Sequence, residues 1–228
     1  ANSVSPLLVG AQGFHKSTFC RNLLPEELYS YYTDSINFAQ KKDAELSLNR
    51  FALINIDEFD QISATQQGFL KHILQKPVVT VRKPHAKATL EMRRYASFIG
   101  TSNLKCLLTD PTGSRRFICI EVKGIIDIDK PIDYKQLYAQ ATYELQHGER
   151  CWFNAEEERI MTESNREFEL LPPEEQLFFR YFRPAATEEE GEWMLPAEIM
   201  QTIQNQTAMP LSNRRFIVFG RILQKHKV

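Results

Sequence analysis

The sequence predicts an α/β fold in which a mostly parallel β-sheet lies between two layers of helices. Short, almost wholly apolar runs recur along the first half of the chain, as the buried strands of a parallel sheet require. Stretches with helical spacing separate these runs, and this alternation is typical of βαβ units. With 228 residues, 43% of them hydrophobic, the chain can form one sizeable domain of this kind and a small second one.

The first strand is expected at 7–9, and it runs directly into a loop that contains glycine. Residues 7–19 read LLVGAQGFHKSTF. The N–H groups of such a loop, and of the helix start behind it, can hold the phosphates of a nucleotide. Lys16 would add a positive charge, and Ser17 would offer its hydroxyl to Mg²⁺. The predicted nucleotide-binding residues are Gly10, Gln12, Gly13, Phe14, His15, Lys16, Ser17 and Thr18.

This loop departs from the usual P-loop spacing pattern at one position, because His15 stands where the pattern has its second glycine. A glycine there permits a positive φ, and histidine tolerates that conformation better than a β-branched residue does. Taken alone, the loop is also compatible with an ordinary strand–turn–helix junction in which Lys16 is a surface lysine. Further motifs have to decide between the two interpretations.

An apolar run at 51–56 predicts a second buried strand, which ends on Asp57 and Glu58. Open α/β sheets bind their ligands at the C-terminal ends of the strands, so these carboxylates are expected beside the loop. Asp57 would hold Mg²⁺ directly or through water, and Glu58 would polarise the attacking water. The alternative is an acidic turn ahead of the next helix, which is expected at 63–74 with Ser63 as its N-cap.

A β-hairpin with a basic tip is expected next, followed by a buried strand at 96–100 and then by Asn103. A polar turn leads through Arg115 and Arg116 into a further strand at 117–122. Asn103 could orient the attacking water or sense the γ-phosphate, and an arginine from a neighbouring subunit could neutralise the charge of the transition state. The alternatives are a plain turn residue for Asn103 and structural ion pairs for the arginines.

The second half of the chain is expected to be largely helical. A helical pattern extends from 132 to about 166, and the acidic, glycine-containing segment 187–192 is typical of a linker. Two short helical patterns follow, and the last one is basic, so it would bind phosphate or form the solvated face of a terminal helix. The predicted division is a core at 1–125, a helical extension at 126–185 and a small helical or winged-helix-like module at 186–228.

Charge and cysteine usage exclude several protein classes. The chain has 28 Lys and Arg against 29 Asp and Glu, so a nucleic-acid site would have to be a local patch. The four cysteines are scattered without a CxxC pair, which argues against a zinc site or a disulfide framework and favours the cytoplasm. No apolar run approaches membrane-spanning length. The chain begins on Ala and enters a strand almost at once, which predicts a piece of a longer protein.

Four segments, in this order and spacing, resemble the virulence-associated E (VirE-like) family of P-loop ATPases: GAQGFHKSTF, INIDEFD, SFIGTSN and DPTGSRRF. That family is similar to superfamily 3 helicases and to phage or plasmid primase-helicases, within the AAA+ class. The resemblance covers about residues 4–122 and implies ATP and Mg²⁺ as cofactors. It also implies a Walker A motif at 10–18, a Walker B motif at 54–58, sensor 1 at Asn103 and an arginine finger at Arg115 or Arg116. The catalytic residues would be Lys16, Glu58, Asn103, Arg115 and Arg116, with Ser17 and Asp57 as the metal ligands.

The resemblance further implies that the basic hairpin contacts DNA in a ring channel, through Lys83, His85 and Lys87. A solvated hairpin tip is the alternative. The expected function is an ATP-dependent DNA helicase or translocase of a mobile element, acting on single-stranded or forked DNA as a homo-oligomeric ring such as a hexamer, away from membranes.

Two other functions stay open. His15 would also fit a degenerate P-loop protein that is switched by nucleotide, or independent of it, and acts as a DNA-binding or assembly module. The near-neutral net charge would fit a P-loop regulator of another protein, without any nucleic acid.

Overall fold

The computed structural model describes residues 3–81, 88–109, 115–185, 187, 190–226 and 228. The chain divides into two compact units, Ala1–Leu170 and Leu171–Val228, and each is described by itself. The sequence-based division has its boundaries at other positions, after residues 125 and 185.

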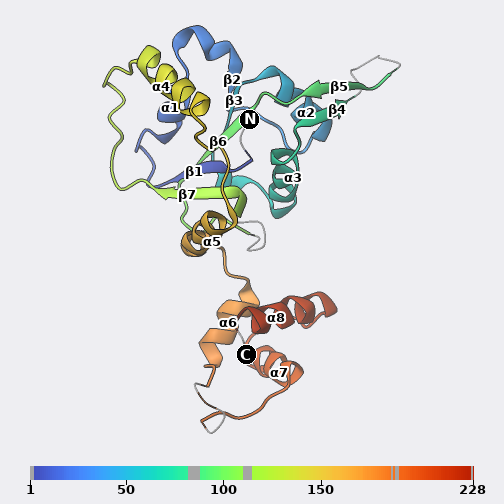
Figure 1. The fold of residues 1–228 in the computed structure, drawn as a ribbon. Helices are drawn as coiled ribbons and strands as arrows, with labels where there is room; N and C mark the ends of the chain where they lie inside the picture. Colours follow the sequence, from blue (N-terminus) through green and yellow to red (C-terminus); the bar gives the residue numbers. More distant parts are fainter. Residues whose placement is uncertain (1–2, 82–87, 110–114, 186, 188–189, 227) are drawn as a thin grey trace. The chain divides into compact units, whose positions relative to one another are not determined.

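A five-stranded sheet forms the centre of the first unit (Figure 1). All its neighbouring strands are parallel, and β1 lies between β6 and β7, with Leu7 opposite both Gly100 and Cys119. The expected α/β fold with a parallel sheet is therefore confirmed. The short β2 is a strand that the sequence pattern does not indicate. In spatial order the strands are β2 (Tyr32–Thr33), β3 (Leu53–Ile56), β6 (Ser97–Ser102), β1 (Ser5–Val9) and β7 (Phe117–Glu121).

Apolar side chains pack on both faces of this sheet. On one face, Leu8 of β1 belongs to a cluster with Cys20 of helix α1 (Lys16–Arg21). On the other face, Leu7 belongs to a larger cluster that includes residues of α2 (Lys41–Arg50) and α3 (Ala64–Leu74). Successive side chains of a strand point to opposite faces, so one apolar strand contributes to both clusters. This arrangement gives the expected three layers.

The helix α3 begins at a capping box. The Ser63 hydroxyl accepts a hydrogen bond from the N–H of Gln66, and the Gln66 side chain accepts one from the N–H of Ser63. Two of the helix's first N–H groups are satisfied in this way, which explains why the helix starts there. The predicted N-cap is therefore confirmed.

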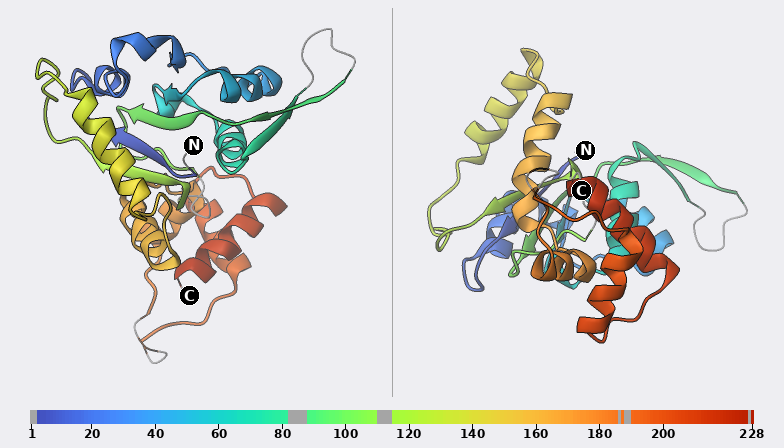
Figure 2. Two further views of the ribbon diagram at one scale, coloured as in Figure 1. Left: turned by 45° about the horizontal axis from the view of Figure 1, so that its top comes forward. Right: turned by 90° about the horizontal axis from the view of Figure 1, so that it is seen from below.

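The predicted hairpin is also present, but its second strand lies at 90–93, whereas the sequence pattern places it at 88–90. The strands β4 (Val78–Val81) and β5 (Leu90–Arg93) pair antiparallel and form a separate two-stranded sheet. Figures 1 and 2 show that this pair projects away from the five-stranded sheet. Lys83, His85 and Lys87 lie outside the described residues.

Beyond β7, the helical pattern expected from 132 to about 166 is divided into two helices, α4 (Tyr134–Gln146) and α5 (Ala155–Ser164). The helix α4 ends before Gly148, whose φ of 89° lies in the left-handed region that often terminates helices. Asn165, directly after α5, is bonded through its side chain to the backbone of β7. The residues after α5 are therefore part of the first unit.

The second unit consists of α6 (Pro173–Tyr181), α7 (Pro196–Gln206) and α8 (Asn213–His226). Phe178, Ile203 and Phe219 contribute one buried side chain from each helix to a common core. No strand is found among the described residues of this unit, so they form a helical module. In the described part of the chain, every helix is too short or too polar to cross a membrane.

Candidate functional site

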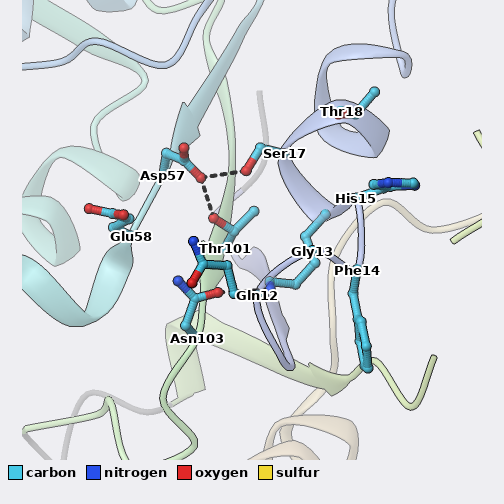
Figure 3. Close-up of a pocket in the computed structure, with 11 residues that line it drawn as sticks. Gln12, Gly13, Phe14, His15, Ser17, Thr18, Asp57, Glu58, Thr101 and Asn103 are labelled. Carbon is cyan, nitrogen blue, oxygen red and sulfur yellow. Dashed lines mark hydrogen bonds between the residues drawn. The ribbon is translucent and has the colours of Figure 1, made fainter. Parts of the chain in front are cut away.

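A cavity of about 230 Å³ opens where β1, β3 and β6 end (Figure 3). It is formed by the loop and helix start after β1, the turn after β3 and the end of β6. The structure thus brings together most of the residues that the sequence singled out. The lining residues are Gln12, Gly13, Phe14, His15, Lys16, Ser17, Thr18, Asp57, Glu58, Thr101 and Asn103.

The loop after β1 depends on three backbone positions. A Cβ on Gly10 would lie 2.7 Å from the carbonyl oxygen of Val122, so a larger residue would collide with backbone there. Gly13 and His15 both have a positive φ, 83° and 60°. His15 therefore adopts the left-handed conformation that the missing glycine would adopt freely. Its ring Nδ1 lies 3.3 Å from the carbonyl oxygen of Ile126 and points away from the Ser17–Asp57 pair (Figure 3).

Lys16 is nearly buried, with 6% of its surface exposed. Its Nζ donates hydrogen bonds to the carbonyl oxygens of Gly10 and Ala11, each at 2.8 Å, and to Oδ1 of Asn103 at 3.0 Å. Burial lowers the pKa of Lys16, and the charges of Asp57 and Asp60 oppose that effect. Two predicted residues that are far apart in the sequence, Lys16 and Asn103, are thus in direct contact.

A second contact joins Ser17 to Asp57. The Ser17 hydroxyl donates to Oδ1 of Asp57 at 2.7 Å, and the Thr101 hydroxyl donates to the same oxygen (Figure 3). A hydroxyl beside a carboxylate offers the hard oxygen ligands that Mg²⁺ prefers. Within the described ranges, no three His, Cys, Asp or Glu side chains are grouped to hold a metal. A Mg²⁺ ion at Ser17 and Asp57 would therefore need the oxygens of a bound phosphate and of water.

Backbone strain is concentrated at this cavity. In the described part of the chain, His15 and Glu58 are the residues other than glycine with a positive φ, and both line it. Such conformations cost about 1–3 kcal/mol each and persist where the surrounding structure enforces them, often at functional sites.

Two polar residues of this region were not predicted to have a role. Thr101 is bonded to Asp57, and Oδ1 of Asp60 accepts hydrogen bonds from the Ser102 hydroxyl at 2.8 Å and the Asn103 N–H at 3.2 Å. Burial by itself raises the pKa of Asp60, but the hydrogen bonds that it accepts outweigh burial and leave the pKa below its ordinary value. A sequence signal for Thr101 exists, because the apolar strand β6 ends on Thr101 and Ser102 and is followed by the polar Asn103.

The two predicted arginines are not part of the cavity in this chain. Arg115 lies near α5, with Nη1 3.9 Å from Oε2 of Glu158, and both side chains are partly exposed to solvent. Neither Arg115 nor Arg116 is among the residues that line the cavity.

Comparison with known proteins assigns each unit to a different family. Residues 3–170 match the virulence-associated protein E-like domain, and residues 171–228 match DUF3874, a domain of unknown function from B. theta. No curated protein sequence matches the chain.

Among solved structures, the chain is similar to three apo structures of the NrS-1 C-terminal region. An A-form structure of residues 305–718 is 17% identical with a TM-score of 0.39, covering 73% of this chain and 35% of that one. A further A-form structure is 15% identical with a TM-score of 0.41, and the match covers 88% of this chain and 42% of that one. The third structure is 16% identical with a TM-score of 0.41, and the match covers 90% of this chain and 43% of that one. The chain spans less than half the length of these proteins. The family match at 3–170 includes most of the residues of this chain, so the chain belongs to the virulence-associated protein E-like domain family.

Proposed function

We propose that the first unit is a P-loop ATPase core of AAA+ type, which powers a DNA helicase or translocase of a mobile element. The observation that carries this proposal is the convergence of Lys16, Ser17, Asp57 and Asn103 from three parallel strand ends on one cavity. A lysine, a hydroxyl, a carboxylate and an amide in this arrangement suit a magnesium-bound nucleoside triphosphate.

Each residue would have a distinct task. Lys16 would exchange its bonds to the loop carbonyls for bonds to the β- and γ-phosphate oxygens. Ser17 and Asp57 would hold Mg²⁺, which neutralises phosphate charge when bound. Glu58 would take the proton of the attacking water, and Asn103, already bonded to Lys16, would orient that water.

A neighbouring subunit would complete the site. Because Arg115 and Arg116 do not line their own cavity, one of them would reach the ATP of the next subunit in a ring. Such an arginine is worth about 10³–10⁵ in rate. Single-stranded or forked DNA would pass along the hairpin of β4 and β5, whose segment 82–87 carries Lys83, His85 and Lys87.

Hydrolysis of ATP by the Lys16→Ala variant tests this proposal. We expect wild-type turnover with Mg²⁺ to rise with added single-stranded DNA and with protein concentration, and the variant to lose it. Lys42→Ala removes an exposed lysine from α2 and should leave turnover unchanged. Circular dichroism would establish that both variants are folded. Turnover that survives Lys16→Ala in a folded protein would show that the site is misassigned.

His15 supports a second candidate, a degenerate P-loop protein that acts as a nucleotide-switched or nucleotide-independent DNA-binding or assembly module. It takes the strained position that a glycine fills without cost, and its ring Nδ1 lies beside the Ile126 carbonyl oxygen. In this case the wild type would bind ATP without turnover or fail to bind it. His15→Gly, which relieves the strain, would then create turnover or binding. If His15→Gly left an active wild type unchanged, this candidate would be rejected.

A further inference from the structure

The helix α8 of the second unit has one face that its own module does not use. Phe219, Ile222 and Leu223 point into the core of the unit. The exposed residues of the helix follow the 3–4 residue spacing of a single face. The exposed residues on this face are Asn213, Arg214, Ile217, Arg221, Gln224 and Lys225.

The charges of α8 fall into two groups. Arg215 pairs with the buried Glu174 at 3.0 Å, and Lys225 pairs with the buried Glu175 at 3.1 Å. These pairs attach α8 to α6 and compensate buried carboxylates. Arg214 and Arg221 are exposed and have no ion pair with any described residue. The helix itself contains no Asp or Glu, so the charged side chains that it contributes to this face are all basic.

The polar residues of this face suit the grooves of nucleic acid. Arg, Asn and Gln form the specific contacts to base edges in the major groove, and arginine also binds phosphates. Ile217, 59% exposed on a face with two unpaired arginines, could contact a thymine methyl group. A helix of 14 residues is about 20 Å long, enough to lie in the major groove, which admits one α-helix.

We propose that the second unit is a double-stranded DNA-binding module that inserts α8 into the major groove. Asn213, Arg214 and Ile217, at the start of the helix, face the base edges, and Arg221 contacts a phosphate. Charge complementarity favours duplex DNA as the partner, because the face combines amide side chains with two arginines that pair with none of the described residues, and α8 itself has no carboxylate. The proposed surface consists of residues of the second unit alone, and its binding to DNA does not depend on ATP hydrolysis.

The test uses the full 228-residue chain and a labelled duplex of about 20 base pairs, with a single strand of the same length for comparison. Fluorescence anisotropy is measured from about 50 to 200 mM salt, because phosphate contacts make binding salt-dependent. The variant is Arg214→Ala/Arg221→Ala. The control, Arg180→Ala/Arg183→Ala, removes the same charge from exposed positions of the same unit outside α8.

We expect the Arg214/Arg221 variant to bind the duplex about tenfold more weakly, with the slope of log K against log salt reduced by about 1 because Arg221 no longer contacts a phosphate. The control should bind as the wild type does. Both arginines are exposed and unpaired, so the melting temperature should not change.

Three results would overturn the proposal: no duplex binding by the wild type at low salt, equal losses in both double variants, or a loss confined to the single strand. ATP binding is measured on the same proteins, so that failure of this DNA-binding proposal can be distinguished from failure of the proposed ATPase. The α8 variants leave the residues of the cavity unchanged and should therefore leave ATP binding unchanged.

Discussion

Replacing Asn165 by alanine would remove the side chain that covers the outer edge of β7. This strand is at the edge of the sheet, so its outward backbone groups have no strand partner. Asn165 is 1% exposed, and its Oδ1 accepts a hydrogen bond from the N–H of Cys119 at 3.2 Å. Its Nδ2 donates to the carbonyl oxygen of Phe117 at 2.7 Å. Alanine would leave one buried donor and one buried acceptor unsatisfied.

The expected cost follows from these two groups. Each unsatisfied buried group costs about 1–3 kcal/mol, so Asn165→Ala should lower the free energy of unfolding by about 2–6 kcal/mol. This is a large part of the roughly 5–15 kcal/mol that stabilises a typical domain. Urea unfolding followed by circular dichroism measures the change, and hydrogen exchange of the Cys119 amide reports directly on the exposed edge.

A neighbouring substitution provides the control. Glu163 is 70% exposed and lies 3.8 Å from Arg166, so Glu163→Ala should change stability by less than about 0.5 kcal/mol. If Asn165→Ala were as mild as this control and the Cys119 amide stayed protected, Asn165 would not cover the edge of β7. The assignment of the segment after α5 to the first unit would then lose its main support.

Two further predictions concern the cysteines and α3. Cys20 and Cys119 are buried, and burial raises the pKa of each thiol to about 12, whereas Cys106 and Cys151 are exposed. An alkylating reagent near pH 8 should therefore label two cysteines in the native protein and four in urea, as counted by mass spectrometry. Labelling of Cys20 in the native protein would contradict the packing of α1 on the sheet. Gly68 lies inside α3, and a Cβ there would meet no atom within 4 Å. Gly68→Ala should raise the free energy of unfolding, measured by urea titration, by about 0.4–1 kcal/mol. A decrease would contradict the open space that the structure shows around Gly68.

The convergence of the site could be predicted because it follows from the fold class. Parallel strands place their C-terminal ends at one edge of the sheet, so the residues after β1, β3 and β6 had to meet there. The apolar runs at 51–56 and 96–100 were sufficient to locate two of those strands. The contact of Ser17 with Asp57 and that of Lys16 with Asn103 follow from this placement.

Other contacts depend on side-chain geometry that no local pattern encodes. The bond from Thr101 to Asp57 requires the register of β6 against β3, and Asp60 accepts a hydrogen bond from Ser102 out of a turn in which Glu58 has a positive φ. Asn165 forms hydrogen bonds to residues 46 and 48 positions earlier in the chain. Hydrophobic periodicity indicates local secondary structure, so it cannot predict contacts between residues this far apart in the sequence. For the same reason the helical residues after β7 could not be assigned to a unit from the sequence.

Binding of ATP in the presence of Mg²⁺ tests the central claim most directly. Isothermal titration calorimetry should give one site per wild-type chain, with a Kd between about 1 μM and 1 mM. Lys16→Ala should abolish binding and Lys42→Ala should preserve it. Absence of binding by the wild type, or unchanged binding by a folded Lys16→Ala protein, would contradict the assignment of this cavity as a nucleotide site.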